Sequence, residues 1–468
     1  MQTECTAQLF AFEEVEERAV VANFAGGEIT SNAGALLLGQ VDRGLALVRR
    51  FAACFIDRRD ARYVEHAVAT LVGQRIFGLA LGYEDLNDHD ELRKDPTFAV
   101  LAGKLRAKLR SDCEALAGKS TLNRLEHTPK RHAAKYHRIE CDGAKVDALL
   151  VDLFLQAHER VPHEIVLDLD NTDIPLYGNQ EGRYFRANYD AYCYLPLYVF
   201  CGRHLLLARQ REANVGGSVG AFMELARIVA QIRQVWPRVR IVVRADSGFA
   251  NDELMAWCEA NRVDYVLGMQ RNSRLEEALI RSLAKAKRQC ERSGKPARVF
   301  QDLRYRTIKT WSRQRRVVGK AEYTLQGANP RFIVTSFSRR AWRARPLYEQ
   351  LYCARGEAEN RLGEQFELFA DRASSATMQA NQLRLWFSAM AYVLVDTLRR
   401  VGLRDTKLAD AAASTIRLKL LKLGAQVRTS VRRICFAIAS SCPNQLDFAL
   451  AYRALCSAFP SYHFRSSA

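Results

Sequence analysis

The sequence predicts a mixed α/β protein, in which a mixed β-sheet is flanked by helices and helical regions precede and follow it along the chain. Three strand-like segments follow one another after residue 164, and helix and strand patterns then alternate, which is typical of such a sheet. Apolar residues recur at helical spacing in about the first 150 residues and again after residue 378. With 48% hydrophobic and 26% charged residues, the 468-residue chain suits a folded globular protein and excludes disordered and collagen-like classes.

The elements are predicted in a definite order. The N-terminal helical pattern is clearest at 34–48 and 63–81. The core is then predicted to contain strands at 165–170, 192–201 and 204–209, a helix at 220–235, a strand at 239–246, a helix at 251–261, a strand at 263–269 and a helix at 273–287. After a basic stretch with short strand-like pieces, a strand at 331–337 and a long helix at 346–369 complete it.

Positive charge is concentrated in two stretches of a chain whose net charge is +18. Residues 281–320 hold 14 Lys and Arg against two acidic residues, and residues 396–440 hold 10 against three. Clustered cations with interleaved aromatic residues, here Tyr305 and Trp311, indicate a polyphosphate partner, DNA or RNA. A solvated basic face is the alternative.

Other classes find no support in the sequence. The 12 cysteines contain no C-x-x-C pair, so we expect buried reduced thiols rather than disulfides or a zinc site. The longest apolar stretch is shorter than the roughly 18 to 20 residues of a membrane span. Because the N-terminus lacks the features of a secretory signal, we expect a cytoplasmic protein.

Carboxylates end two strands of the predicted sheet. A period of two places Asp168 and Asp170 on one face of the first strand, and Asp246 ends the strand at 239–246. Carboxylates that meet at one edge of a sheet suit Mg²⁺ or Mn²⁺. Aspartates that cap turns or helices are the alternative.

The helix at 346–369 carries a phenol, a cation and a carboxylate on one face. Tyr352, Arg355 and Glu359 stand at i, i+3 and i+7, which is one side of an α-helix. An exposed ion pair between Arg355 and Glu359 is the alternative interpretation.

Taken together, these residues resemble bacterial insertion-sequence transposases of the DDE class, which have a ribonuclease H-like core. The three signatures are DNT at 170–172, DSGF at 246–249 and the stripe of Tyr352, Arg355 and Glu359. The sequence is more closely similar to the insertion-sequence family numbered 1380. The segments that carry this resemblance are GYEDLNDHD at 82–90, AGKSTLNRLE at 117–126, YCYLPLY at 192–198, LYCARGE at 351–357 and NQLRLW at 381–386.

The resemblance implies a role for individual residues. Asp170, Asp246 and Glu359 would bind two Mg²⁺ or Mn²⁺ ions, with Asp170 bridging both, and Tyr352 and Arg355 would hold DNA near the reacting phosphate. Related transposases carry a lysine where this chain has Phe366, so a basic role there is absent or passes to a residue such as Arg361. Further DNA contacts are expected in the basic insertion, from Arg313, Arg315, Arg316 and Lys320.

We therefore expect a cut-and-paste DNA transposase that acts as a homodimer on double-stranded DNA, at the terminal inverted repeats and the target, in the nucleoid. A metal-dependent nuclease that does not join DNA and a DNA-binding protein without catalysis are the alternatives. The expected regions are an N-terminal helical, DNA end-binding region (1–155), the first part of the core (160–287), a basic insertion (288–330), the second part of the core with the glutamate helix (331–372) and a C-terminal helical region (373–468).

Overall fold

The computed structural model describes residues 10–106, 114–127, 137–187 and 190–460. It divides into two compact units. The first contains residues 1–140 and 390–468, and the second, which carries the predicted core, contains residues 141–389.

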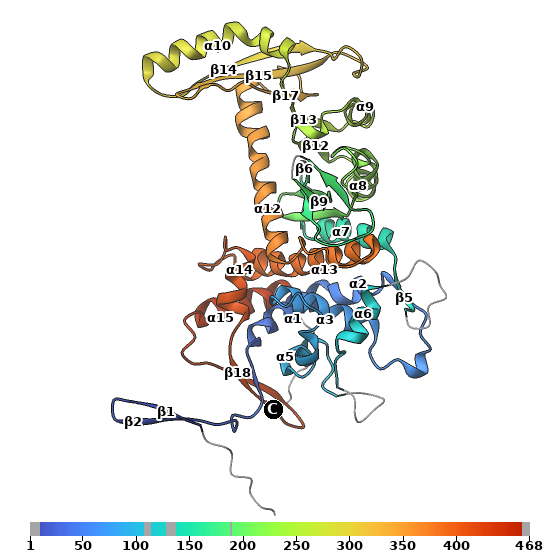
Figure 1. Ribbon diagram of the computed structural model, residues 1–468, viewed down its shortest axis with the longest axis vertical. Helices are drawn as coiled ribbons and strands as arrows, with labels where there is room; N and C mark the ends of the chain where they lie inside the picture. Colours follow the sequence, from blue (N-terminus) through green and yellow to red (C-terminus); the bar gives the residue numbers. More distant parts are fainter. Residues whose placement is uncertain (1–9, 107–113, 128–136, 188–189, 461–468) are drawn as a thin grey trace, which may run out of the picture. The chain divides into compact units, whose positions relative to one another are not determined.

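The second unit is built on one nine-stranded sheet (Figure 1). Its strand order is β11-β10-β6-β12-β13-β17-β15-β14, with the short β16 paired to β15. The strands are β6 (Glu164–Asn171), β10 (Leu197–Cys201), β11 (His204–Arg209), β12 (Arg240–Ala245), β13 (Asp264–Met269), β14 (Ala297–Tyr305), β15 (Arg315–Thr324), β16 (Gly327–Ala328) and β17 (Arg331–Thr335).

The strand directions give the sheet its mixed character. β10 runs antiparallel to both β6 and β11, whereas β12 and β13 run parallel to β6. β11, β10 and β6 are thus antiparallel neighbours, and β12 and β13 lie on the other side of β6 and run parallel to it. This arrangement is that of a ribonuclease H-like core, which confirms the expected fold class. β17, β15 and β14 extend the same sheet as antiparallel strands, so the stretch predicted as a basic insertion continues it.

One predicted strand is broken. The segment 192–201 was expected to be continuous, but β9 (Ala191–Tyr194) belongs to a separate small sheet with β7 (Ile174–Pro175) and β8 (Tyr184–Arg186). Only β10, after the break, pairs with β6. Pro196 lies in the break and has no N–H to donate to a strand ladder.

Alternate residues of the central strands pack on opposite faces. Ile241 and Val243 of β12 contribute to a core with the helices α7 (Gly143–Gln156), α8 (Ala221–Val235), α9 (Asp252–Ala260) and α10 (Ser273–Ser293). Val242 faces the other way and packs with Leu347 and Leu351. Figure 1 shows α7, α8 and α9 on one side of the strands and α12 (Gly356–Glu367) on the other.

The predicted helix at 346–369 is helical but irregular. It begins with the short α11 (Ala344–Pro346), continues as a π-helical segment (Leu347–Tyr352) and a 3₁₀ turn (Cys353–Arg355), and becomes regular only in α12. Changes of helix type of this kind are frequent at functional sites.

The first unit combines helices with short strands. Its helices are α1 (Leu36–Leu45), α2 (Leu47–Ala52), α3 (Val68–Ala80), α4 (His89–Leu92), α5 (Pro96–Leu101), α6 (Lys119–Glu126), α14 (Ala413–Ile416) and α15 (Gln445–Ala458), while α13 (Met378–Thr397) begins in the second unit and ends in the first. These end regions, expected to be mainly helical, also contain strands. β3 (Ile29–Thr30), β18 (Ala425–Thr429) and β19 (Ile434–Ile438) form a sheet from both ends of the chain, and β1 (Phe10–Val15) and β2 (Arg18–Ala22) form an exposed hairpin.

Two further expectations can be compared with the described residues. The ten cysteines among them are free thiols, but Cys353 and Cys435 are exposed rather than buried as expected. Cys5 and Cys113 lie outside the described ranges. None of the described helices combines the length and the apolar character needed to cross a membrane.

Candidate functional site

Asp170 and Asp246 meet at one edge of the sheet. β6 and β12 are parallel, with Asp168 opposite Arg244 and Leu169 opposite Ala245, so the next residue along each strand brings Asp170 and Asp246 level. Asp170 is only 8% exposed. The pairing of two parallel strands therefore places two predicted carboxylates side by side at their carboxyl ends.

Glu359 comes to the same edge from α12. The preceding π-helical segment packs Leu347, Tyr348 and Leu351 against the sheet. Arg355 then contacts carboxylates from two elements: its Nη1 lies 3.4 Å from Asp170 Oδ2, and its Nη2 donates a hydrogen bond to Glu359 Oε1. Arg355 thus connects Asp170 with Glu359, and Asp246 lies close enough for its charge to act on Asp170.

The electrostatics of Asp170 reflect this crowding. Burial raises the pKa of its carboxyl to about 6, and the nearby charges of Asp246 and Glu359 add to the rise. Arg355 and a hydrogen bond from the Asn171 backbone amide, 3.0 Å long, oppose it. Asp170 is therefore a carboxylate that gains strongly from a neighbouring cation.

The donor set fits a hard divalent cation. Carboxylate oxygens are the ligands that Mg²⁺ and Mn²⁺ prefer. Among the described residues, no three acidic, histidine or cysteine side chains are already gathered as a metal-binding group. The guanidinium of Arg355 instead lies between Asp170 and Glu359, which shows that the site accommodates positive charge.

Asp168 is separated from this group although it lies on the same face of β6. Its carboxylate accepts two hydrogen bonds from Arg244, from Nε at 2.5 Å and from Nη2 at 2.8 Å. Both residues are buried. Of the two aspartates that the sequence placed on one face, Asp168 is thus held in an ion pair, and Asp170 faces Arg355.

Tyr352 lies beside the site, and its hydroxyl packs closely against Gly268 of β13. An added Cβ at Gly268 would lie 2.5 Å from the Tyr352 hydroxyl and 2.8 Å from the backbone nitrogen of Ser247, which directly follows Asp246. Burial raises the pKa of Tyr352, and Asp246 is among the charges that act on it. Sequence reasoning missed Gly268, although a glycine inside a strand is a signal of close approach.

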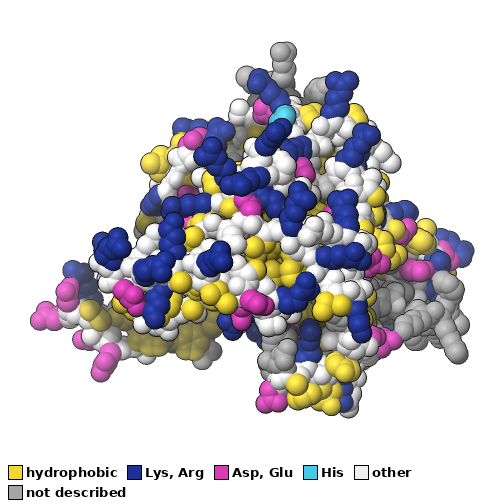
Figure 2. All heavy atoms as spheres, turned by 90° about the horizontal axis from the view of Figure 1, so that it is seen from above, with side chains coloured by type: hydrophobic (Ala, Val, Ile, Leu, Met, Phe, Trp, Pro, Cys, Tyr) yellow, Lys and Arg dark blue, Asp and Glu magenta, His cyan; other side chains and the backbone are white. Residues whose placement is uncertain are grey.

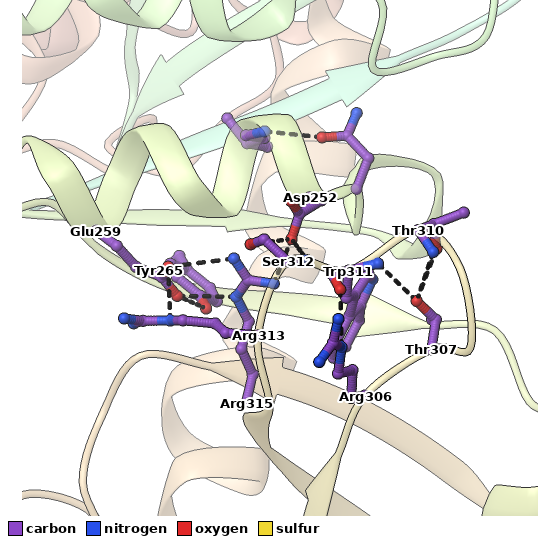
Figure 3. A network of polar contacts seen from close by, with 12 residues as sticks. Asp252, Glu259, Tyr265, Arg306, Thr307, Thr310, Trp311, Ser312, Arg313 and Arg315 are labelled. Carbon is purple, nitrogen blue, oxygen red and sulfur yellow. Dashed lines mark hydrogen bonds and ion pairs between the residues drawn. The ribbon is translucent and has the colours of Figure 1, made fainter.

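The basic residues expected to contact DNA are mostly paired within the protein. Arg315 is 4% exposed and lies between Asp252 and Glu259 of α9 (Figure 3). The other four are paired as follows: Arg313 with Glu259, Arg316 with Asp302, Lys320 with Glu322 and Arg361 with Glu364. Of these five, only Arg313 keeps a largely exposed side chain, at 62%. Sequence position alone does not show such pairing. Arg315, Arg316 and Lys320 are held in ion pairs within the protein, and their contact with DNA stays a prediction.

Exposed cations lie instead along α10. Its buried side carries Leu275, Leu279, Ala286 and Cys290. The opposite side carries a stripe of exposed cations at i, i+4, i+7 and i+11, here called the α10 stripe: Arg281, Lys285, Arg288 and Arg292. Within the described part of the chain, no ion pair involves these four side chains. Figure 2 shows Lys and Arg side chains gathered on the face of the second unit where α10, β14 and β15 lie in Figure 1.

Comparison with known proteins identifies a family that the chain matches. A family model described as transposase DDE domain, group 1, matches residues 12–458. No curated protein matches the chain. Among solved structures, the chain is similar to a cryo-EM structure of piggyBac transposase in a synaptic complex with hairpin DNA. The sequence identity is 10%, the match covers 83% of this chain and 80% of that chain, and the TM-score is 0.40.

Proposed function

The chain belongs to the transposase DDE domain family, group 1, and we propose that it performs cut-and-paste transposition of its own insertion sequence. In this proposal it binds the terminal inverted repeats of the element, cuts the strands by hydrolysis and joins the freed 3′-ends to target DNA. The observation that carries the proposal is that Asp170 and Asp246 end neighbouring parallel strands and that Arg355 pairs with both Asp170 and Glu359.

Asp170, Asp246 and Glu359 are the proposed ligands of two divalent ions, Mg²⁺ or Mn²⁺. When bound, such ions activate water or a 3′-hydroxyl and stabilise the leaving oxygen of an in-line displacement at phosphorus. The chain itself orients the ligands. The Asn171 backbone amide holds one oxygen of Asp170, and α12 presents Glu359 from the facing side of the sheet. In this proposal the guanidinium of Arg355, beside Tyr352, would bind a DNA phosphate next to the carboxylates.

The α10 stripe supports double-stranded DNA as the partner, because its cations are exposed and evenly spaced along one side of a helix. Two element ends must be handled together, so the proposal includes a homodimer on DNA. It also includes a bacterial origin, membership of the insertion-sequence branch numbered 1380, and action in the cytoplasm at the nucleoid.

The test is cleavage of a DNA that carries both element ends, with Mg²⁺ or Mn²⁺, by the full chain and by Asp246→Asn. The matched control is Asp264→Asn, which removes a carboxylate from the opposite end of the neighbouring strand β13. We expect metal-dependent cleavage by the parent and the control, and end binding without cleavage by Asp246→Asn.

The same assay separates the alternatives. If the protein cuts the element ends but does not join pre-cleaved ends to a target, it is a nuclease. End binding without cleavage by any variant would indicate a DNA-binding protein, and equal cleavage by parent and Asp246→Asn would show that the active site lies elsewhere.

A further inference from the structure

Arg244 is a buried cation inside an otherwise apolar strand. It lies in β12 between Val243 and Ala245 and is 6% exposed. Besides its two hydrogen bonds to Asp168, its Nη1 donates a third, 2.7 Å long, to the backbone carbonyl oxygen of Leu351. One guanidinium therefore contacts both β6 and the helical segment that precedes α12.

These contacts connect the three elements that carry the proposed ligands. Asp168 lies two residues before Asp170 on β6, and Arg244 of β12 lies two residues before Asp246, which directly follows that strand. Leu351 directly precedes Tyr352 in the segment that continues into α12 and Glu359.

The contact with Leu351 falls where the helix changes type. Leu351 belongs to the π-helical segment, which gives way to a 3₁₀ turn at Cys353 and to α12 at Gly356. Helices bend where a side chain inserts into the backbone hydrogen-bond ladder. A donor at the Leu351 carbonyl is therefore well placed to determine how α12 leaves the sheet.

Stability alone is a poor explanation for this arrangement. A buried ion pair is often replaced by apolar residues of similar volume without loss of stability, because removing both charges from water is costly. The forked guanidinium can bond a carboxylate through two N–H groups and a carbonyl through a third, which a lysine ammonium cannot reproduce. The pair also keeps Asp168 from competing with Asp170 for a cation on the same face of β6.

We propose that Arg244 is a positioning residue of the carboxylate site, which fixes α12 and its glutamate relative to the two aspartates through Asp168 and the Leu351 carbonyl. This inference rests on the proposed function for its effect on catalysis. The positioning itself is a property of the protein without DNA or metal.

The test compares Arg244→Lys with Arg240→Lys in the full chain. Arg240 lies on the same strand and also forms ion pairs with both neighbouring strands, to Glu164 and Asp264, but at the other end of the sheet. Three readouts are used: hydrogen exchange of residues 351–360 without ligands, Mn²⁺ binding measured by calorimetry without DNA, and cleavage of element-end DNA.

We expect Arg244→Lys to keep the parent circular dichroism spectrum, to exchange faster at 351–360 but not in α8, and to bind Mn²⁺ about 10-fold more weakly. Its cleavage rate should fall about 100-fold, whereas Arg240→Lys should match the parent in all three readouts. If Arg244→Lys does not fold, Asp168→Asn, which keeps the arginine and its bond to Leu351, is measured in the same way.

Unchanged exchange at 351–360 together with unchanged Mn²⁺ binding would overturn the proposal. Equal losses in Arg244→Lys and Arg240→Lys would also overturn it, because the effect would then be a general loss of ion pairing. If the parent neither binds Mn²⁺ nor cleaves DNA, the proposed function fails, and the exchange data still decide whether Arg244 holds the helix.

Discussion

Removing two cations from the α10 stripe should weaken DNA binding and make the affinity less dependent on salt concentration. The double change Arg281→Gln and Arg288→Gln removes side chains that are exposed, are seven residues apart and point to the same side of the helix. Neither contributes to the buried side of α10, so the fold should persist. DNA binding should therefore weaken because two phosphates are no longer neutralised, and not because the protein unfolds.

The size of the effect follows from counterion release. Each phosphate contact contributes about −0.9 to the slope of log K against log salt, so two lost contacts should make the slope shallower by about 1.8. Over a fourfold rise in salt, the affinity of the parent should then fall about 12-fold more than that of the variant, because four to the power 1.8 is about 12. All four cations of the stripe together would account for a slope near −3.6.

The assay is fluorescence anisotropy of a labelled duplex at several salt concentrations. The control is Arg227→Gln with Arg240→Gln, which removes the same net charge from residues that are ion-paired with Glu224 and with Glu164 and Asp264. A variant slope equal to that of the parent would refute the assignment of α10 to DNA. A control slope reduced as much as that of the variant would show that only net charge matters.

Three further results are expected. Asp170→Asn should be more stable than the parent at pH 7 without divalent ions. The pKa of Asp170 is raised from 3.8 to about 6 in the folded protein, so the parent loses stability as the pH rises between these values. Chemical denaturation at pH 7 and pH 4 should show that the difference between parent and variant is smaller at pH 4. Gly268→Ala should displace Tyr352 and slow cleavage, since its Cβ would lie 2.5 Å from the hydroxyl, whereas Gly363→Ala, with no atom within 4 Å, should cleave normally. Arg75→Met should lower the free energy of unfolding in urea by about 3–5 kcal/mol, because it removes the guanidinium that pairs with the buried Glu126 carboxylate. Arg62→Met, at an exposed pair, should leave the free energy of unfolding nearly unchanged, and similar losses in both variants would contradict the difference in burial.

The sequence alone determined most of the core of the fold and indicated a candidate site. Strands and helices of the core follow from local periodicity, so the mixed sheet and the ends of β6 and β12 were predictable from a single chain. That two strands ending in aspartate can bring their carboxylates together was also predictable, but that β6 and β12 are parallel neighbours is shown only by the structure. Glu359 could be proposed from its spacing to Arg355 on one helix.

Only the tertiary structure decided which charged side chains are free. Asp168 and Asp170 are equivalent by periodicity, and the pairing of β6 with β12 distinguishes them by setting Arg244 beside Asp168. In the same way, Arg315 differs from Arg281 only through Asp252 and Glu259, which come from α9, more than 50 residues earlier in the chain. The physical reason is that charge is visible in a sequence, but the partner that neutralises it is brought close only by folding.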